Sequence, residues 1–295
     1  MSKNLEGAVW ALAAAALYAV SAALGKFAAN DYHILQILFF RQIIVFLSVL
    51  PIVARNFPDN LKTQHPLAHG FRLGGAFIAL SMGLWAVSVL PLATAVVLMF
   101  SQTFIIALLA MWFLGEGLGV HRLASIFIGF AGVVIVVRPG LDGFFETNSL
   151  IPIGASMGAA VAVIVVRKLS QFESTATLLS YQAIFVGLLS GVPLFWLWVT
   201  PDLTGLLMLL AIGIVATFGQ WIGIKALRLG EASLVSSIKY TELIYAAILG
   251  YWFFADMPDA WTLAGATIII ASAIYMIRRE AHVAKIALLE KPAPA

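Results

Sequence analysis

The sequence predicts an all-α membrane protein in which ten transmembrane helices form two inverted repeats of five. The first observation behind this prediction is composition: 62% of the 295 residues are hydrophobic, only 11% are charged, and the mean hydropathy is +1.01. Soluble domains carry about 25% charged residues, so a water-soluble fold is excluded. The second observation is a series of long apolar runs, and the third is a similarity between the two halves of the chain.

Charged residues, Pro and Gly divide the chain into ten apolar runs, most of them at least about 18 residues long, as a membrane helix requires. We expect helices at residues 5–29, 33–54, 68–90, 93–114, 120–138, 149–167, 175–199, 204–227, 231–255 and 259–278. The N-terminal run could pass for a secretory signal, but the spans that follow it favour a retained first helix. The turns at Pro91 and Pro258 are so short that the helices they join must run antiparallel and side by side.

Basic residues gather on one side of this predicted topology. If the N-terminus is cytoplasmic, the loops and tails on that side hold 13 of the 17 Lys and Arg residues, namely Lys3, Arg55, Lys62, Arg72, Arg122, Arg167, Lys168, Lys225, Arg228, Arg278, Arg279, Lys285 and Lys291. The acidic residues of the opposite side are Asp31, Asp142, Glu146, Asp202, Asp256 and Asp259. Cytoplasmic loops collect Lys and Arg, so we expect a multi-pass protein of the cytoplasmic (inner) membrane with both termini in the cytoplasm.

An internal repeat appears when the chain is compared with itself at a shift of 140 residues. The first-half residues Ala107, Leu109, Trp112, Phe113, Leu123, Ala124, Ala131 and Arg138 fall on Ala247, Leu249, Trp252, Phe253, Leu263, Ala264, Ala271 and Arg278. Glu116 also falls on the acidic Asp256, and Gln42 falls on Gln182. Five helices per repeat is an odd number, so the second copy must enter the membrane from the opposite face. Such inverted repeats are typical of secondary transporters.

Each predicted five-helix unit closes with two aromatic residues followed three positions later by an acid, Trp112-Phe113 with Glu116 and Trp252-Phe253 with Asp256. With this ending and ten helices, nearly the whole chain resembles the EamA family of the drug/metabolite transporter superfamily, and the overall pattern is most similar to that of the YddG-type aromatic amino-acid exporters. The resemblance implies a basket-like bundle, with a central cavity lined by helices one to four and six to nine. Many members carry Glu where this chain has Asp256. We expect the first repeat at 1–146, the second at 147–280 and a cytoplasmic tail at 281–295.

Two charged residues lie deep in the ninth predicted span. At about 1.5 Å per residue from Glu231, Lys239 lies about 12 Å and Glu242 about 16 Å into a hydrocarbon layer about 30 Å thick. A charge at that depth usually faces a protein interior or a watery cavity and serves function. One interpretation is a neutralised pair that only fixes packing. The other is a binding site, in which Lys239 meets a substrate carboxylate and Glu242 meets an ammonium group.

Further candidates for the substrate site surround this depth. Gln102 is the repeat counterpart of Glu242, and together with Ser101 it forms a polar patch that could equally hold helices together. Apolar walls are expected from the more central aromatic residues, which are Tyr18, Trp85, Trp221 and Tyr240, with Gln220 beside Trp221. Each of these aromatic residues is more often a packing residue than a ligand. Arg41 is expected to pair with Asp31 or a backbone carbonyl, and Lys26 to anchor a helix at the membrane surface.

These features favour a secondary transporter that exports amino acids, including aromatic and other apolar ones, by alternating access. The alternative is export of other small metabolites or drugs. A hypothesis from a different functional class is a membrane receptor or structural protein without transport. An enzyme is not expected, because no nucleophile with its base and no metal motif lies inside the spans. We expect no cofactor, no metal and no nucleic-acid partner, only a small-molecule substrate and the lipid bilayer, with the chain as a monomer or weak homodimer.

The absence of cysteine from the sequence makes the predicted orientation simple to test. A single Cys replacing Asp142 or Asp202 should react with a membrane-impermeant thiol reagent in intact cells, because both positions are expected outside. A Cys replacing Arg55 or Lys168 should react only after the cells are opened. The reverse pattern would overturn the topology.

Overall fold

The computed structural model describes residues 3–55, 63, 65–114, 120–137, 147–169, 172–229, 235 and 238–289, and the described parts contain helices and no strand. The helices are α1 (Lys3–Ala28), α2 (Ile34–Arg55), α3 (Pro66–Val89), α4 (Leu92–Met99), α5 (Gln102–Leu114), α6 (Val120–Val137), α7 (Leu150–Leu169), α8 (Thr175–Gly191), α9 (Leu194–Leu197), α10 (Leu203–Leu229), α12 (Thr241–Phe254) and α13 (Ala260–Leu289), with a 3-10 turn η2 at Thr147–Ser149. Within these residues, seven helical stretches have the length and apolar composition to cross a membrane, and three shorter apolar helices accompany them.

Four predicted spans differ from the observed helices, namely those at 93–114, 175–199, 231–255 and 259–278. The span at 93–114 is interrupted at Phe100 and Ser101, which separate α4 from α5. The span at 175–199 ends at Gly191, because Pro193 begins the separate short helix α9. Helix α13 continues to Leu289, past the end of the apolar run at residue 278.

The interruption of α4 and α5 recurs at the equivalent place in the second half. Lys239 and Tyr240 form a turn directly before α12, and Tyr240 is the counterpart of Phe100 at a shift of 140 residues. Corresponding backbone bonds bridge the two turns, from the Thr103 amide to the Phe100 carbonyl and from the Leu243 amide to the Tyr240 carbonyl. The rings of Phe100 and Tyr240 pack against each other, with their centroids 4.7 Å apart. The two interrupted helices therefore meet at their turns.

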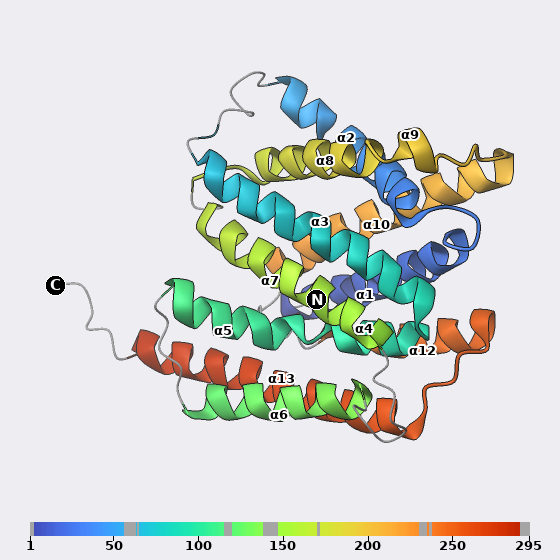
Figure 1. Ribbon diagram of the computed structural model, residues 1–295. Helices are drawn as coiled ribbons and strands as arrows, with labels where there is room; N and C mark the ends of the chain where they lie inside the picture. Colours follow the sequence, from blue (N-terminus) through green and yellow to red (C-terminus); the bar gives the residue numbers. More distant parts are fainter. Residues whose placement is uncertain are drawn as a thin grey trace.

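Helices from the two halves of the chain pair along their lengths. The most extensive contacts join α3 with α7, α1 with α10, α6 with α13, and α2 with α8. In Figure 1, α6 and α13 lie together along one edge of the bundle and α2 lies beside α8 at the opposite edge. The largest cluster of buried apolar side chains lies between these edges, where α4, α5, α6, α12 and α13 meet.

Glycines allow the closest of these helix contacts. A Cβ atom on Gly158 of α7 would lie 2.7 Å from the carbonyl oxygen of Gly75 in α3, and the reverse distance is also 2.7 Å. Gly132 of α6 and Gly265 of α13 face each other in the same way. Small residues let membrane helices touch through their backbones, and Gly154 and Gly158 lie four residues apart on α7.

We predict that Gly158→Ala destabilises the folded protein by about 1–3 kcal/mol, because the added methyl group meets backbone atoms that move only with the whole helix. Thermal unfolding in detergent measures the effect. Gly74→Ala in α3 is the matched control, since a Cβ there meets nothing within 4 Å. Equal melting temperatures for the two variants would contradict the close α3–α7 contact.

Candidate functional site

Two cavities lie inside the helix bundle and share part of their walls. The first, which we term the central cavity, has a volume of about 280 Å³ and is lined by Tyr18, Ala79, Leu80, Val96, Met99, Phe100, Gln102, Ala155, Ser156, Ala159, Lys239 and Glu242. The second, the end cavity, has a volume of about 340 Å³ and is lined by Ala11, Ala14, Ala15, Tyr18, Gln220, Gly223, Ile224, Ala226, Val235 and Lys239. The end cavity lies toward the N-terminus of α1 and the C-terminus of α10. These volumes suit a small metabolite.

The structure brings five of the nine predicted site residues to the cavity walls. They are Tyr18, Gln102, Gln220, Lys239 and Glu242. Ser101 and Tyr240 are buried beside the central cavity and do not line it. Trp85 and Trp221 are 46% and 42% exposed and lie outside both linings. The rotation of each helix about its axis decides which of its side chains face a cavity. Of the predicted aromatic residues only Tyr18 lines the central cavity, together with Phe100.

A hydroxyl from the other half of the chain lies beside the interruption between α4 and α5. The Ser156 hydroxyl of α7 is within hydrogen-bonding distance of three carbonyl oxygens, those of Pro152 in its own helix at 2.9 Å, Met99 at 3.0 Å and Leu98 at 3.4 Å, and its one proton serves one of them at a time. In the second half, Thr241 satisfies the Ile238 carbonyl itself, at 2.7 Å. A side chain inserted into the helical bonding pattern is a known cause of helix interruption. The interruptions place Gln102 and Glu242 at the first turns of α5 and α12.

Lys239 and Glu242 both line the central cavity, and no ion pair joins them in the part of the chain that the structure describes. Their charges still lie within electrostatic range of each other. Glu242 occupies the first turn of α12, where the helix dipole stabilises a carboxylate. The described residues thus contain no direct ion pair between Lys239 and Glu242, and both side chains line the central cavity.

Arg41 differs from its expected pairing. Among the described residues it forms no hydrogen bond or ion pair, its Nε atom is buried without a partner, and Asp31 is exposed. The groups within electrostatic range of the Tyr18 hydroxyl are Arg41 and Glu242. The guanidinium stays protonated in proteins, so Arg41 adds positive charge beside a residue of both cavity walls.

Comparison with known proteins gives this arrangement its context. The model of the EamA-like transporter family matches residues 5–138 and again residues 149–278. The chain belongs to the EamA-like transporter family. It is thus a multi-pass membrane protein of the drug/metabolite transporter superfamily, and the expectation that it is not an enzyme agrees with relatives that are transporters.

The named relatives transport different compounds. An S-adenosylmethionine uptake transporter of Rickettsia bellii is 28% identical over 93% of this chain and 94% of its own. A riboflavin transporter of Vibrio cholerae is 26% identical, with 94% of each chain covered, and a pseudopaline exporter of Pseudomonas aeruginosa is 27% identical over 92% of this chain and 96% of its own. A crystal structure with 18% identity shares the fold, with a TM-score of 0.62 over 94% of this chain and 99% of that one. None of the three named transporters is specifically an aromatic amino-acid exporter.

At one end of this transporter an ion pair ties the two halves together. Lys26 of α1 donates to Asp256, after the end of α12, at 2.6 Å and to the Leu90 carbonyl at 2.8 Å. The same Asp256 oxygen accepts the amide of Leu92 at the start of α4, at 3.2 Å. These bonds join the first half of the chain to the second. Lys26 was expected to anchor a helix at the membrane surface, but its side chain is only 14% exposed and pairs with Asp256 instead. The corresponding Glu116 lies outside the described residues.

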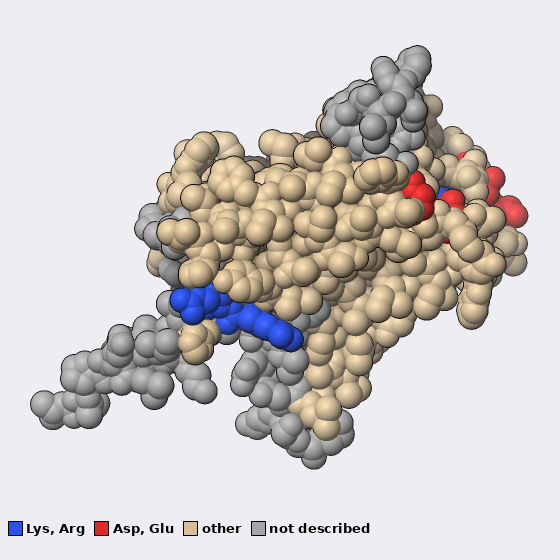
Figure 2. All heavy atoms as spheres, turned by 90° about the horizontal axis from the view of Figure 1, so that it is seen from below, with Lys and Arg blue, Asp and Glu red and all other residues tan. Residues whose placement is uncertain are grey.

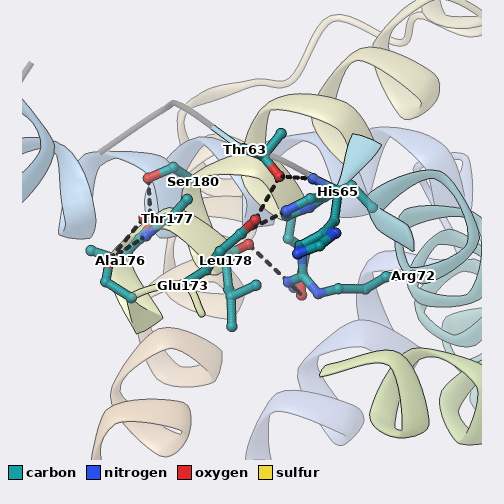
Figure 3. A network of polar contacts seen from close by, with 11 residues as sticks. Thr63, His65, Arg72, Glu173, Ala176, Thr177, Leu178 and Ser180 are labelled. Carbon is teal, nitrogen blue, oxygen red and sulfur yellow. Dashed lines mark hydrogen bonds and ion pairs between the residues drawn. The ribbon is translucent and has the colours of Figure 1, made fainter. Parts of the chain in front are cut away.

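A polar network closes the opposite end of the bundle around the start of α3 (Figure 3). Glu173, in the turn between α7 and α8, accepts from Thr63 and pairs with His69 Nε2, both at 2.6 Å. Arg72 donates to the Leu178 carbonyl at 2.8 Å. The sequence analysis counted Arg72 among the loop and tail residues of one side, but Arg72 is buried in α3 together with His69. Their partners come from more than 100 residues away, and no local pattern marks such pairing.

We predict that Lys26→Ala and Asp256→Ala each lower the free energy of unfolding by about 2 kcal/mol, because each leaves a partly buried charged hydrogen bond unmade. Thermal unfolding of both single variants and the double variant forms a double-mutant cycle. The double variant should lose less than the sum of the two single losses. Asp31→Asn, at an exposed carboxylate, is the control. Strictly additive losses would show that the pair does not interact.

Proposed function

We propose that this chain is a secondary transporter of small amphipathic metabolites that carry a zwitterionic head group. The observation that carries the proposal is the central cavity, where Lys239, Glu242 and Gln102 from the two halves line one space with Tyr18 and Phe100. Lys239 suits a carboxylate, Glu242 suits an ammonium group, and the two rings suit an apolar or aromatic body. A membrane protein that only relays a signal or builds a scaffold has no need of charged groups left unpaired at this depth.

The arrangement of helices supports two inverted five-helix repeats, with ten membrane helices in all. The family model matches each half once. Helix contacts are also repeated when each helix is replaced by its counterpart 140 residues away. The contact of α3 with α7 corresponds to that of α10 with α1, and the contact of α5 with α7 corresponds to that of α12 with α1. The meeting point of the halves, at Phe100 and Tyr240, adjoins the central cavity. Alternating access requires a site that both faces can reach in turn, and this location provides it.

Charge separation supports the proposed orientation, in which both termini are cytoplasmic. On the face shown in Figure 2, basic side chains gather toward one end and acidic ones at the other. Arg278 and Arg279 lie near the end of α13, at the same end of the bundle as the start of α3, and Asp31 and Asp202 lie in turns at the opposite end. Lys and Arg mark the cytoplasmic side.

The relatives support a broader substrate class than amino acids. S-adenosylmethionine combines an amino-acid head with a large heteroaromatic body, riboflavin has the aromatic body without the head, and pseudopaline is a further metabolite. The cavity walls suit the broader class of small metabolites with a zwitterionic head and an apolar or aromatic body, and they do not require an aromatic amino acid. Free amino acids remain the narrower form of the proposal, because they share the same head group.

Counterflow in liposomes that contain only this protein tests the function. We expect S-adenosylmethionine or tryptophan inside the liposomes to drive entry of the labelled compound, with riboflavin carried less well because it lacks a zwitterionic head. Lys239→Gln, Glu242→Gln and Gln102→Ala should each reduce the initial rate at least about tenfold, as expected when a charge-assisted hydrogen bond is lost.

Trp85→Ala is the control for this experiment, because Trp85 is exposed and lies outside both cavities. Its rate should stay within about twofold of the unchanged protein, a difference of less than about 0.5 kcal/mol. Absence of counterflow with all three compounds would remove the proposed substrate class. Equal rates in the three cavity variants and the unchanged protein would move the site elsewhere.

A further inference from the structure

Two side chains, Tyr18 and Lys239, line both the central cavity and the end cavity. We infer that Tyr18 and Lys239 form the constriction between the two cavities, and that a substrate passes it by displacement of the Tyr18 ring and selection of negative charge by Lys239. The inference rests on the proposed function and specifies which residues control entry to that same site.

Steric relations around Tyr18 support a movable barrier. Its ring lies against α10, where a Cβ on Gly219 would be 3.5 Å from the ring and one on Gly223 would be 3.6 Å from the hydroxyl oxygen. The repeat counterpart of Tyr18 is Gly158, which packs against Gly75 through backbone atoms. The α3–α7 contact is therefore sealed by backbone, which moves only with a whole helix. The equivalent α1–α10 contact is filled by side chains of α1, chiefly Leu17 and Tyr18. The Tyr18 ring can rotate while the helices stay in place.

The charged residues around the constriction follow an order along the path from the end cavity to the central cavity. Lys239 is exposed to the cavity space and forms no ion pair among the described residues. Arg41, also without a counter-ion there, lies within electrostatic range of Tyr18. The acidic residue of the central cavity wall, Glu242, does not line the end cavity. A substrate that approaches through the end cavity thus meets positive charge first and negative charge afterwards, an order that favours a carboxylate-bearing zwitterion over a simple cation.

Single cysteines in the otherwise cysteine-free chain test this inference without any substrate. Ala159→Cys places a thiol in the central cavity, and Ala11→Cys places one in the end cavity. The two reagents are the anionic sulfonatoethyl and the cationic trimethylammonioethyl methanethiosulfonate, applied to purified protein in detergent. Each cysteine is combined with Tyr18→Ala, Tyr18→Leu, Tyr18→Phe or Lys239→Gln, and the elution volume of every variant on size exclusion confirms its fold.

At Ala159→Cys, the Tyr18→Ala or Tyr18→Leu change should accelerate modification at least about tenfold, because access limits the reaction of a thiol. Tyr18→Phe, which keeps the ring, should leave the rate slow. The anionic reagent should react faster than the cationic one at Ala159→Cys, and Lys239→Gln should abolish this preference. Ala11→Cys, on the near side of the constriction, should react at one rate in all Tyr18 variants.

Three results overturn the inference. The first is an unchanged rate at Ala159→Cys after both Tyr18→Ala and Tyr18→Leu, and the second is a reagent preference that Lys239→Gln leaves intact. The third is rapid modification at Ala159→Cys in the unchanged background, which would show that no barrier separates the cavities. None of these results depends on transport, so a failure of this inference is distinct from a failure of the counterflow experiment.

Discussion

Backbone hydrogen bonding constrains every helix of this transporter, because a carbonyl or amide left unpaired in hydrocarbon costs several kcal/mol. Within the described residues, regular helix is interrupted at two equivalent places, before α5 and before α12. At the first, the Ser156 hydroxyl from the other half lies within hydrogen-bonding distance of the Leu98 and Met99 carbonyls. At the second, the Thr241 hydroxyl donates to the Ile238 carbonyl. Such bonds lower the cost of interrupting a helix inside the membrane.

Charged residues within the membrane separate into two kinds. Lys26 and Asp256 pair closely and also satisfy the turn between α3 and α4, so they hold the halves together at one end. Lys239 and Glu242 line the central cavity without an ion pair between them among the described residues. A paired charge contributes to the fold, whereas an unpaired one at a cavity wall is free to bind a charged ligand. The same residue types therefore serve structure in one place and recognition in the other.

The two halves share a plan, yet their contacts are not identical, and the differences are where function is proposed. Gly158 seals α7 against α3, and its counterpart Tyr18 fills the space between α1 and α10. Ser156 has Ala16 as its counterpart, so the second interruption receives no hydroxyl from α1. The α3–α7 contact is closed by backbone atoms, whereas the equivalent α1–α10 contact borders the end cavity.

Hydrophobic spacing along the chain by itself determined the membrane class and most helix positions, because length and apolar composition decide whether a helix can cross a bilayer. Only the tertiary structure decided which side chains share a wall. Trp85 and Trp221 turn outward, Tyr18 turns inward, and Lys26, His69 and Arg72 find distant partners. Such orientations depend on helix rotation and on the interruption beside Ser156, which arise from contacts between residues far apart in sequence.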